Sequence, residues 1–220
     1  MNGLSAGIAA RQWLAGAWLG DGAMGPVEEI NSQCLDLLTD MAVWPLVAAR
    51  LPGVLAAQLP LWQELTPLAR ASLAASPYLL ADAGFDDESR WQRLGAGMVR
   101  DQQRDFIQPA FEGEMVAGFV RRVLVLGWHL ARVNRQLARV VLGMSPACAV
   151  QLCSLGLRDL DWIVEHRPGW VRPRWELQPR IWKHLLLAAH EDDPRRLTQA
   201  GLRGIQLMAA AVLPAQPREL

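Results

Sequence analysis

The chain has 220 residues, of which 51% are hydrophobic, and its formal charges sum to zero. This length and composition allow a substantial core, in one larger domain or two small ones. No apolar stretch of about 18 residues is free of charge, which excludes a predicted membrane span, and three cysteines cannot form a disulfide framework. The first residues lack the basic start of a secretory signal, so a cytoplasmic protein is predicted.

The charge is distributed unevenly along the chain. Through Gly97 there are five arginines and no lysine against ten acidic residues, whereas from Met98 onward 17 basic residues face 12 acidic ones. Glycine, proline and polar residues interrupt the pattern between these parts. We therefore expect an acidic helical N-terminal domain of unknown type over residues 1–97, a hinge over 98–114 and a basic helical domain over 115–220.

The N-terminal part is predicted to consist of short helices separated by glycine and proline. Strand-like alternation is almost absent, so the predicted fold class is all-α. Helices are expected at about 5–19, 27–50, 53–59, 61–75 and 88–98. Asp86 is placed to cap the last of these helices. The carboxylates around it favour capping and solvation over a cation site, because the ligand spacing of a calcium loop is missing.

A long heptad-patterned helix is predicted after the hinge. Apolar residues from Val116 to Met144 recur at alternating steps of three and four. Such a seam, kept for about four heptads, must be covered by another helix of this chain or by a second copy of it. We predict a homodimer or larger assembly. The predicted dimer seam consists of Phe119, Val123, Leu126, Leu130, Val133, Leu137 and Val140.

The outward side of the same helix is basic. Arg121, Arg132, Arg135 and Arg139 recur there near integral helical turns. They predict a basic stripe beside the seam.

Two short helices are predicted to follow. Gly143 can adopt the left-handed conformation of a helix C-cap, and Ser145-Pro146 supplies an N-cap and a first-turn proline. The first short helix is expected to end at Leu155-Gly156-Leu157 and the second to run from Arg158 to about His166, with Leu157, Leu160 and Val164 inward. This pair has the general shape of a helix-turn-helix, although helical proteins make many such corners without binding DNA.

The run from Val140 to Trp175 resembles the core of the flagellar transcriptional activator FlhD, without a gap. Downstream, Arg195 to Ala209 is similar to the closing helix of that family, so the resemblance covers roughly residues 120 to 210. The matching features are Leu142-Gly143 at the end of the long helix, the small and apolar Ala149 and Leu152, the Leu155-x-Leu157-x-x-Leu160 corner, and Glu165 at the end of the second short helix.

The resemblance implies an all-helical, dimeric subunit of a bacterial transcription regulator, with 115–220 as the FlhD-like domain. In that family the subunit acts with a partner, FlhC, which carries the zinc site and much of the DNA binding. Residues 1 to about 112 have no counterpart in the family. The exposed positions expected on the second short helix are mostly acidic, and phosphates would be repelled by them. They are Arg158, Asp159, Asp161 and Glu165.

The segment from Gly169 to Leu187 is the predicted DNA- or partner-binding surface, because it interleaves cations with large aromatic side chains. Arginine and tryptophan can bind phosphates and stack on bases, and both are common in protein interfaces. The alternative is a stable corner in which arginines lie over tryptophans. The predicted binding residues are Arg172, Arg174, Arg180, Lys183, Trp170, Trp175 and Trp182.

Motifs of catalysis are missing. There is no nucleophile elbow, phosphate-binding loop, dinucleotide fingerprint or four-ligand zinc set, so neither enzyme activity nor a metal or cofactor is predicted. Two functions remain. The leading hypothesis is a FlhD-like regulator subunit that contacts DNA alone or with an FlhC-like partner. The alternative is a cytoplasmic adaptor or scaffold that holds another protein, for example in a secretion or motility assembly.

Overall fold

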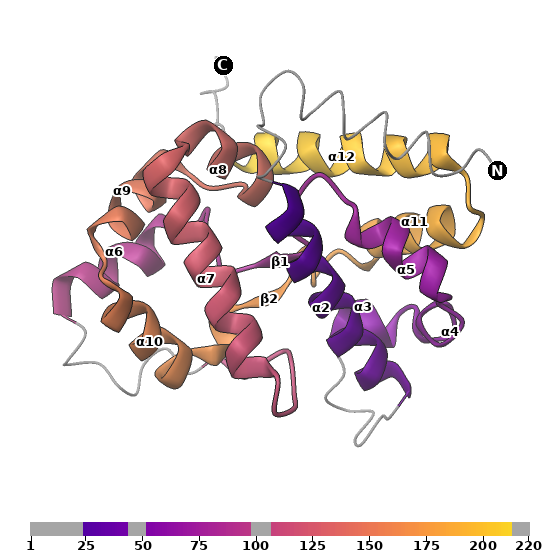
Figure 1. The fold of residues 1–220 in the computed structure, drawn as a ribbon, viewed down its shortest axis with the longest axis horizontal. Coiled ribbons are helices and arrows are strands. Elements are labelled where there is room, and N and C mark those ends of the chain that lie inside the picture. Colours follow the sequence, from indigo (N-terminus) through magenta and orange to yellow (C-terminus); the bar gives the residue numbers. More distant parts are fainter. Residues whose placement is uncertain (1–23, 44–51, 98–106, 213–220) are drawn as a thin grey trace, which may run out of the picture.

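The computed structural model describes residues 24–43, 52–97 and 107–212. These residues are 73% helical, which confirms the all-α class (Figure 1). The predicted helix at 5–19 and most of the predicted hinge lie outside the described residues.

Within residues 24–43 and 52–97 the chain forms five helices, and two of them, at 59–63 and 67–74, replace the single helix predicted at 61–75. The expected helix at 61–75 is interrupted, because Thr66 accepts a hydrogen bond from the Ala69 amide (3.2 Å) and Pro67 occupies the first turn of a new helix. The predicted helix at 27–50 begins earlier and is described only as far as Val43. The helices are α2 (Met24–Val43), α3 (Gly53–Ala56), α4 (Leu59–Gln63), α5 (Pro67–Ala74) and α6 (Glu88–Gly97).

The cap of α6 is Asp87 and not Asp86. The Asp87 carboxylate accepts hydrogen bonds from the Ser89 hydroxyl (2.7 Å) and the Arg90 amide (3.0 Å). Burial alone would raise the pKa of Asp87, but these hydrogen bonds, with the nearby guanidinium groups of Arg90 and Arg93, lower it overall. The ionised carboxylate is therefore the form that the fold favours.

Replacing Asp87 with alanine should lower the free energy of unfolding by about 1 kcal/mol at neutral pH, because α6 loses its cap. A carboxyl with a lowered folded-state pKa contributes stability above its unfolded pKa and loses it as the pH falls through the folded one. Urea unfolding at several pH values should show the difference between wild type and D87A shrinking in acid. A difference that grows as the pH falls would contradict this role.

Two short strands join the halves of the chain. Strand β1 (Ala81–Asp82) pairs antiparallel with β2 (Arg172–Pro173), with Ala81 opposite Pro173. Helices also pack across the two halves: α2 against α7, and α5 against α11. These contacts join the predicted parts 1–97 and 115–220 through one buried cluster.

The predicted long helix is broken in two, which corrects the expectation of one continuous heptad helix. Helix α7 (Val116–Val133) ends where Asn134 leaves helical geometry, and α8 (Arg135–Leu142) begins there. The Asn134 side chain accepts a hydrogen bond from the Leu137 amide (3.0 Å) and so caps α8. Asparagine competes with the helical backbone in this way, and the apolar spacing concealed the break.

The corner after α8 follows the predicted capping. Gly143 is left-handed (φ 65°), and the Ser145 hydroxyl accepts a hydrogen bond from the Cys148 amide. Leu157, expected to point inward, is 57% exposed. The remaining helices are α9 (Pro146–Ser154), α10 (Leu157–His166), the 3₁₀ helix η2 (Pro168–Trp170), α11 (Pro179–His190) and α12 (Pro194–Val212).

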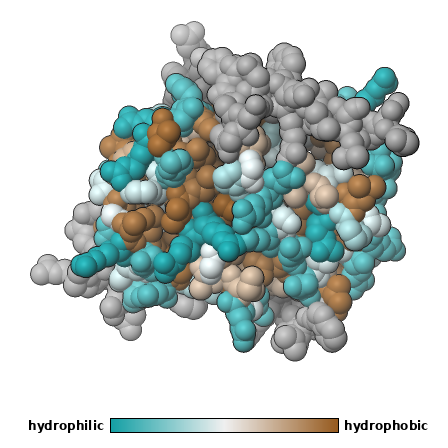
Figure 2. All heavy atoms as spheres, in the orientation of Figure 1, coloured by the Kyte–Doolittle hydropathy of each residue, from teal (hydrophilic) through white to brown (hydrophobic). Residues whose placement is uncertain are grey.

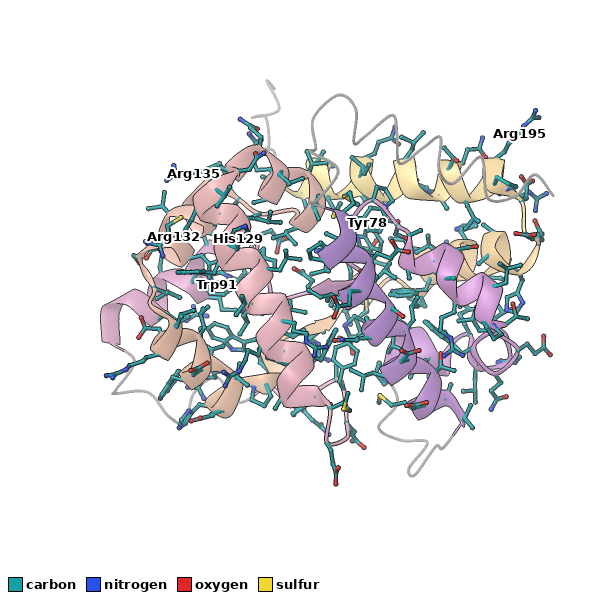
Figure 3. The ribbon with its side chains drawn as sticks, viewed as in Figure 1. Tyr78, Trp91, His129, Arg132, Arg135 and Arg195 are labelled. Atoms are coloured by element: carbon teal, nitrogen blue, oxygen red, sulfur yellow. The ribbon has the colours of Figure 1, made fainter. Side chains whose placement is uncertain are left out.

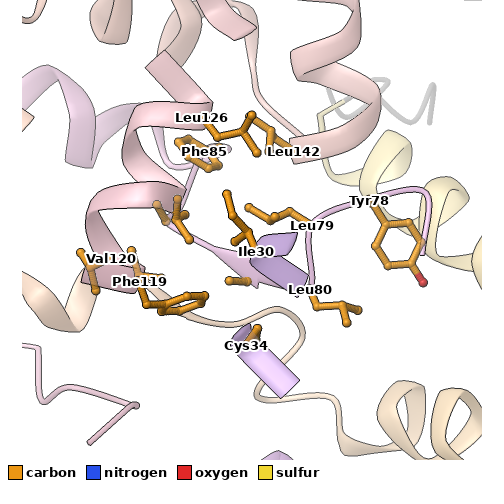
Figure 4. Packing of buried hydrophobic residues seen from close by; sticks show 14 of the residues in the cluster. Ile30, Cys34, Tyr78, Leu79, Leu80, Phe85, Phe119, Val120, Leu126 and Leu142 are labelled. Atoms are coloured by element: carbon orange, nitrogen blue, oxygen red, sulfur yellow. The ribbon is translucent and has the colours of Figure 1, made fainter. Parts of the chain in front are cut away.

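The core lies where α2 and α7 meet the segment after α5. Figure 4 shows Ile30 and Cys34 of α2 near Leu79 and Leu80, with Phe119 of α7 on the opposite side. Glycine 127 of α7 makes room for the Phe85 ring, since a Cβ there would lie 2.6 Å from it. Helix α12 runs along one edge of the molecule, over α11 and α8 (Figure 1).

Candidate interaction surface

Three of the seven residues of the predicted Arg/Trp surface, Trp170, Arg174 and Trp182, are buried. Trp182 is fully buried, donates its indole N–H to the Arg174 carbonyl (2.6 Å) and lies against Trp62 with ring centroids 5.3 Å apart. Trp170 is buried and meets Trp91 edge to face. These rings supply bulk to the core, as large aromatic side chains commonly do. They are not available for stacking on bases.

The guanidinium of Arg174 is used inside the protein. It donates to the carbonyl oxygens of Leu79 (2.7 Å), Ala81 (3.3 Å) and Leu142 (3.0 Å), and it lies 3.7 Å from the Asp82 carboxylate. Only 6% of Arg174 is exposed. Arg174 therefore joins three chain segments and cannot contact a phosphate in this fold.

The other predicted cations divide into a paired one and two free ones. Arg172 donates from Nε and Nη2 to the two carboxylate oxygens of Glu176, and from Nη1 to the Gln108 carbonyl (2.8 Å). Arg180 and Lys183 are exposed on α11, without an ion pair among the described residues. Trp175 is partly exposed and has a positive φ of 54°. The structure thus exposes Arg180 and Lys183, leaves Trp175 partly exposed, pairs Arg172 with Glu176 and buries the other three predicted residues.

The predicted dimer seam is mostly covered by this chain itself. Val133 and Val140, which are 70% and 43% exposed, are the exceptions. Helix α7, which carries four of the buried members, packs against α2, α9 and α10, and α8, which carries Leu137, packs against α7, α9 and α12, so other helices of this chain cover the buried part of the seam. Self-association remains a prediction, and in this fold it would have to use other contacts. The buried seam residues are Phe119, Val123, Leu126, Leu130 and Leu137.

An exposed basic surface lies on α7 and α8. We call this surface the cationic face. Figure 3 shows His129, Arg132 and Arg135 following one another where α7 meets α8, and Figure 2 shows apolar atoms beside hydrophilic ones on that side of the molecule. The cationic face consists of Arg122, His129, Arg132, Arg135 and Arg139, with the exposed Val125, Val133 and Val140 between them.

Two members of the predicted basic stripe have partners. Arg121 pairs with Asp161 of α10 (3.0 Å), so its charge is neutralised. Arg132 lies over the Trp128 ring, 4.5 Å from its centroid, and Trp128 is held by donating to the Leu155 carbonyl (2.9 Å). Arg122 was not part of the predicted stripe. Consecutive helical residues point in different directions, so Arg121, which was assigned to the stripe, and Arg122 were not expected to share it. It is exposed, with no ion pair among the described residues.

The charge of the cationic face is not balanced from within its own segment. From Met115 to Arg158 the chain has six arginines and no acidic residue. The neighbouring acidic helix is α10, where Asp161 is paired with Arg121 and Glu165 is exposed. The cationic face is thus bounded on one side by negative charge, which limits how large a polyanion could lie across it.

Helix α10, the second helix of the predicted helix-turn-helix unit, has few features of a DNA-reading helix. Asp159 accepts a hydrogen bond from the Gly156 amide (2.7 Å) and so closes the start of the helix. Trp162 stacks on His166 with centroids 4.6 Å apart. The carboxylates of Asp161 and Glu165 lie on this helix, and phosphates avoid carboxylates.

Two of the carboxylates around α6, those of Asp82 and Asp87, accept hydrogen bonds from nearby groups of this chain. Asp82 accepts hydrogen bonds from the Gly84 and Phe85 amides (3.2 and 3.4 Å), and Asp87 caps α6. Burial, and next the Asp82 carboxylate, raise the pKa of Asp86. Within residues 24–43, 52–97 and 107–212, no group of three or more His, Cys, Asp or Glu side chains could hold a metal ion.

None of the described helices alone is long and apolar enough to cross a membrane. Helices α8 and α9 meet that test only when taken together, and they are bent by 115° at the break between them.

The cysteines differ in predicted reactivity. Burial raises the pKa of Cys34, and burial likewise raises that of Cys148, to about 11, although a hydrogen bond with Ser145 opposes it. Cys153 is partly exposed. A disulfide reagent should therefore modify Cys153 in the native protein and the other two thiols only after unfolding. Rapid modification of Cys34 in the native protein would show that α2 is packed differently.

Comparison with protein-family models, curated proteins and solved structures found no match.

Proposed function

We propose that the protein is a non-enzymatic adaptor that binds another protein through the cationic face of α7 and α8. The observation that supports this proposal most strongly is that exposed valines lie on that face beside arginines that have no carboxylate partner among the described residues. Arginine is enriched in protein interfaces, where its long side chain supplies both apolar contact and hydrogen bonds. Exposed aliphatic side chains gain from burial against a protein but not against phosphates.

The burial of part of the Arg/Trp segment supports the same proposal. Arg174, Trp170 and Trp182 are buried in the fold, which removes three of the seven groups that favoured DNA contact at that place. A zero net charge and an acidic helix beside the cationic face also fit a protein partner better than a duplex. A cytoplasmic adaptor in a secretion or motility assembly is consistent with these features.

Purification of the tagged full-length chain from nuclease-treated lysate tests the proposal. We expect one protein to co-purify in stoichiometric amount, and light scattering of the product should report the masses of both the complex and any homodimer. Loss of every partner on nuclease treatment would overturn the adaptor function.

A FlhD-like regulator subunit is the second candidate, and the acid-free run from Met115 to Arg158 favours it. Under this function the cationic face contacts duplex DNA, alone or beside an FlhC-like partner. Titration with non-specific duplex at two salt concentrations tests it, because each phosphate contact adds close to one unit of slope. Tight binding that weakens steeply with salt, and that R122E/R132E abolishes, would replace the adaptor proposal.

A further inference from the structure

A single line of exposed side chains runs along α7. Arg122, Val125, His129 and Arg132 are separated by three, four and three residues, so they lie on one side of the helix. The line is about 15 Å long, since a helix rises about 1.5 Å per residue. Val125 is 36% exposed and lies between positively charged and polar neighbours. We call these four residues the α7 stripe.

The side of α7 away from the stripe is buried against other helices. It packs against α2, α9 and α10, and buries Phe119, Val123 and Leu130. The stripe itself is different. Among the described residues, neither Arg122 nor Arg132 has a carboxylate partner, and the exposed Val133 extends the apolar surface at its end. Within the described part of the chain, the stripe therefore presents two cations without a carboxylate partner, about three helical turns apart, with aliphatic surface between and beyond them.

We propose that the α7 stripe binds an acidic amphipathic segment of another protein, with carboxylates placed against Arg122 and Arg132 and an apolar side chain against Val125. This inference rests on the adaptor function and adds the chemistry of the partner. Charge complementarity selects an acidic partner, because opposite charges across an interface guide association and fix the register. The exposed valines select an amphipathic one.

Two other occupants fit the stripe less well. A duplex would gain nothing from the valines, and because it is wider than a single peptide segment it would extend beyond the stripe toward the exposed Glu165 of α10, which packs against α7. A second copy related by a two-fold axis would place the stripe against itself, and an antiparallel pairing would set Arg122 against Arg132. Like charges in that arrangement repel each other.

Site-specific photo-crosslinking identifies the occupant. A photoreactive residue replaces Val125 in the full-length chain, expressed in its own cells, and Leu68 of α5, which is 60% exposed, serves as the control position. We expect crosslinks at position 125 to a peptide of another protein that has an excess of carboxylates. The charge reversal R122E/R132E should reduce their yield at least about tenfold, whereas R180E/K183E, with the same change in net charge, should not. Lysines introduced at the crosslinked carboxylates should restore the yield with R122E/R132E.

The other outcomes overturn the inference. Crosslinks to DNA, to a second copy of this chain or to a peptide without excess acid would each assign the stripe to a different occupant. Absence of crosslinks above the Leu68 control would leave the stripe unoccupied. If a stoichiometric partner still co-purifies in that case, the adaptor function stands and its surface lies elsewhere. If none does, both proposals fail.

Discussion

Replacing Arg174 with methionine is expected to lower the free energy of unfolding by about 3 to 5 kcal/mol, the largest effect of any single substitution considered for this chain. Methionine fills part of the volume but has no donors. The carbonyl oxygens of Leu79, Ala81 and Leu142, which the guanidinium now satisfies, would lose their hydrogen bonds inside the protein. Asp82 would also lose the cation beside it.

Urea unfolding followed by tryptophan fluorescence measures this effect. The matched control is Arg180→Met, because Arg180 is exposed on α11 and its replacement should change stability by less than about 0.5 kcal/mol. Equal stabilities of the two variants would show that Arg174 does not hold these segments together. Arg174 would then be free to serve the DNA-binding role that its sequence context predicts.

Replacing Asn31 with alanine should lower the free energy of unfolding by about 3 kcal/mol. The buried Asn31 side chain donates to the carbonyls of Ala74 (3.1 Å) and Tyr78 (2.9 Å) and accepts from the Leu80 amide (2.7 Å). It therefore anchors α2 to the segment that leads into β1. Alanine would leave these three backbone groups without a partner in a region closed to water.

Ser32→Ala is the control for this substitution, since Ser32 is the next residue of α2 and is partly exposed. We expect S32A to unfold within about 0.5 kcal/mol of wild type. In N31A, hydrogen exchange should also accelerate first at the Leu80 amide, because that amide loses its acceptor. Unchanged protection there would indicate that another group replaces Asn31.

The helical class could be predicted from the sequence because apolar periodicity and capping residues are local signals. The Gly143-Ser145-Pro146 corner shows this: each residue acts through its own backbone or the next turn. The break at Asn134 was a local signal too, but the heptad spacing continues across it. Periodicity alone therefore could not distinguish one long helix from two helices that share a buried side.

The candidate site was harder to predict, because the sequence does not show which arginines the fold will use. Arg174 contacts residues about 30 to 95 positions away, and no neighbouring residue indicates this. Arg180 lies six residues further on and stays exposed. Val133 and Val140 have the spacing of seam residues, yet the turn at Asn134 leaves them on the surface. Tertiary contacts decided each of these cases.

The most direct test of the account compares partner recovery by two charge-reversed chains. The full-length R122E/R132E and R180E/K183E variants would be purified beside wild type from nuclease-treated lysate, and the bound partner quantified per chain. We predict that R122E/R132E retains less than about a tenth of the partner, while R180E/K183E retains nearly all of it. Equal recovery by both variants, or loss only with R180E/K183E, would contradict the assignment of the cationic face as the binding surface.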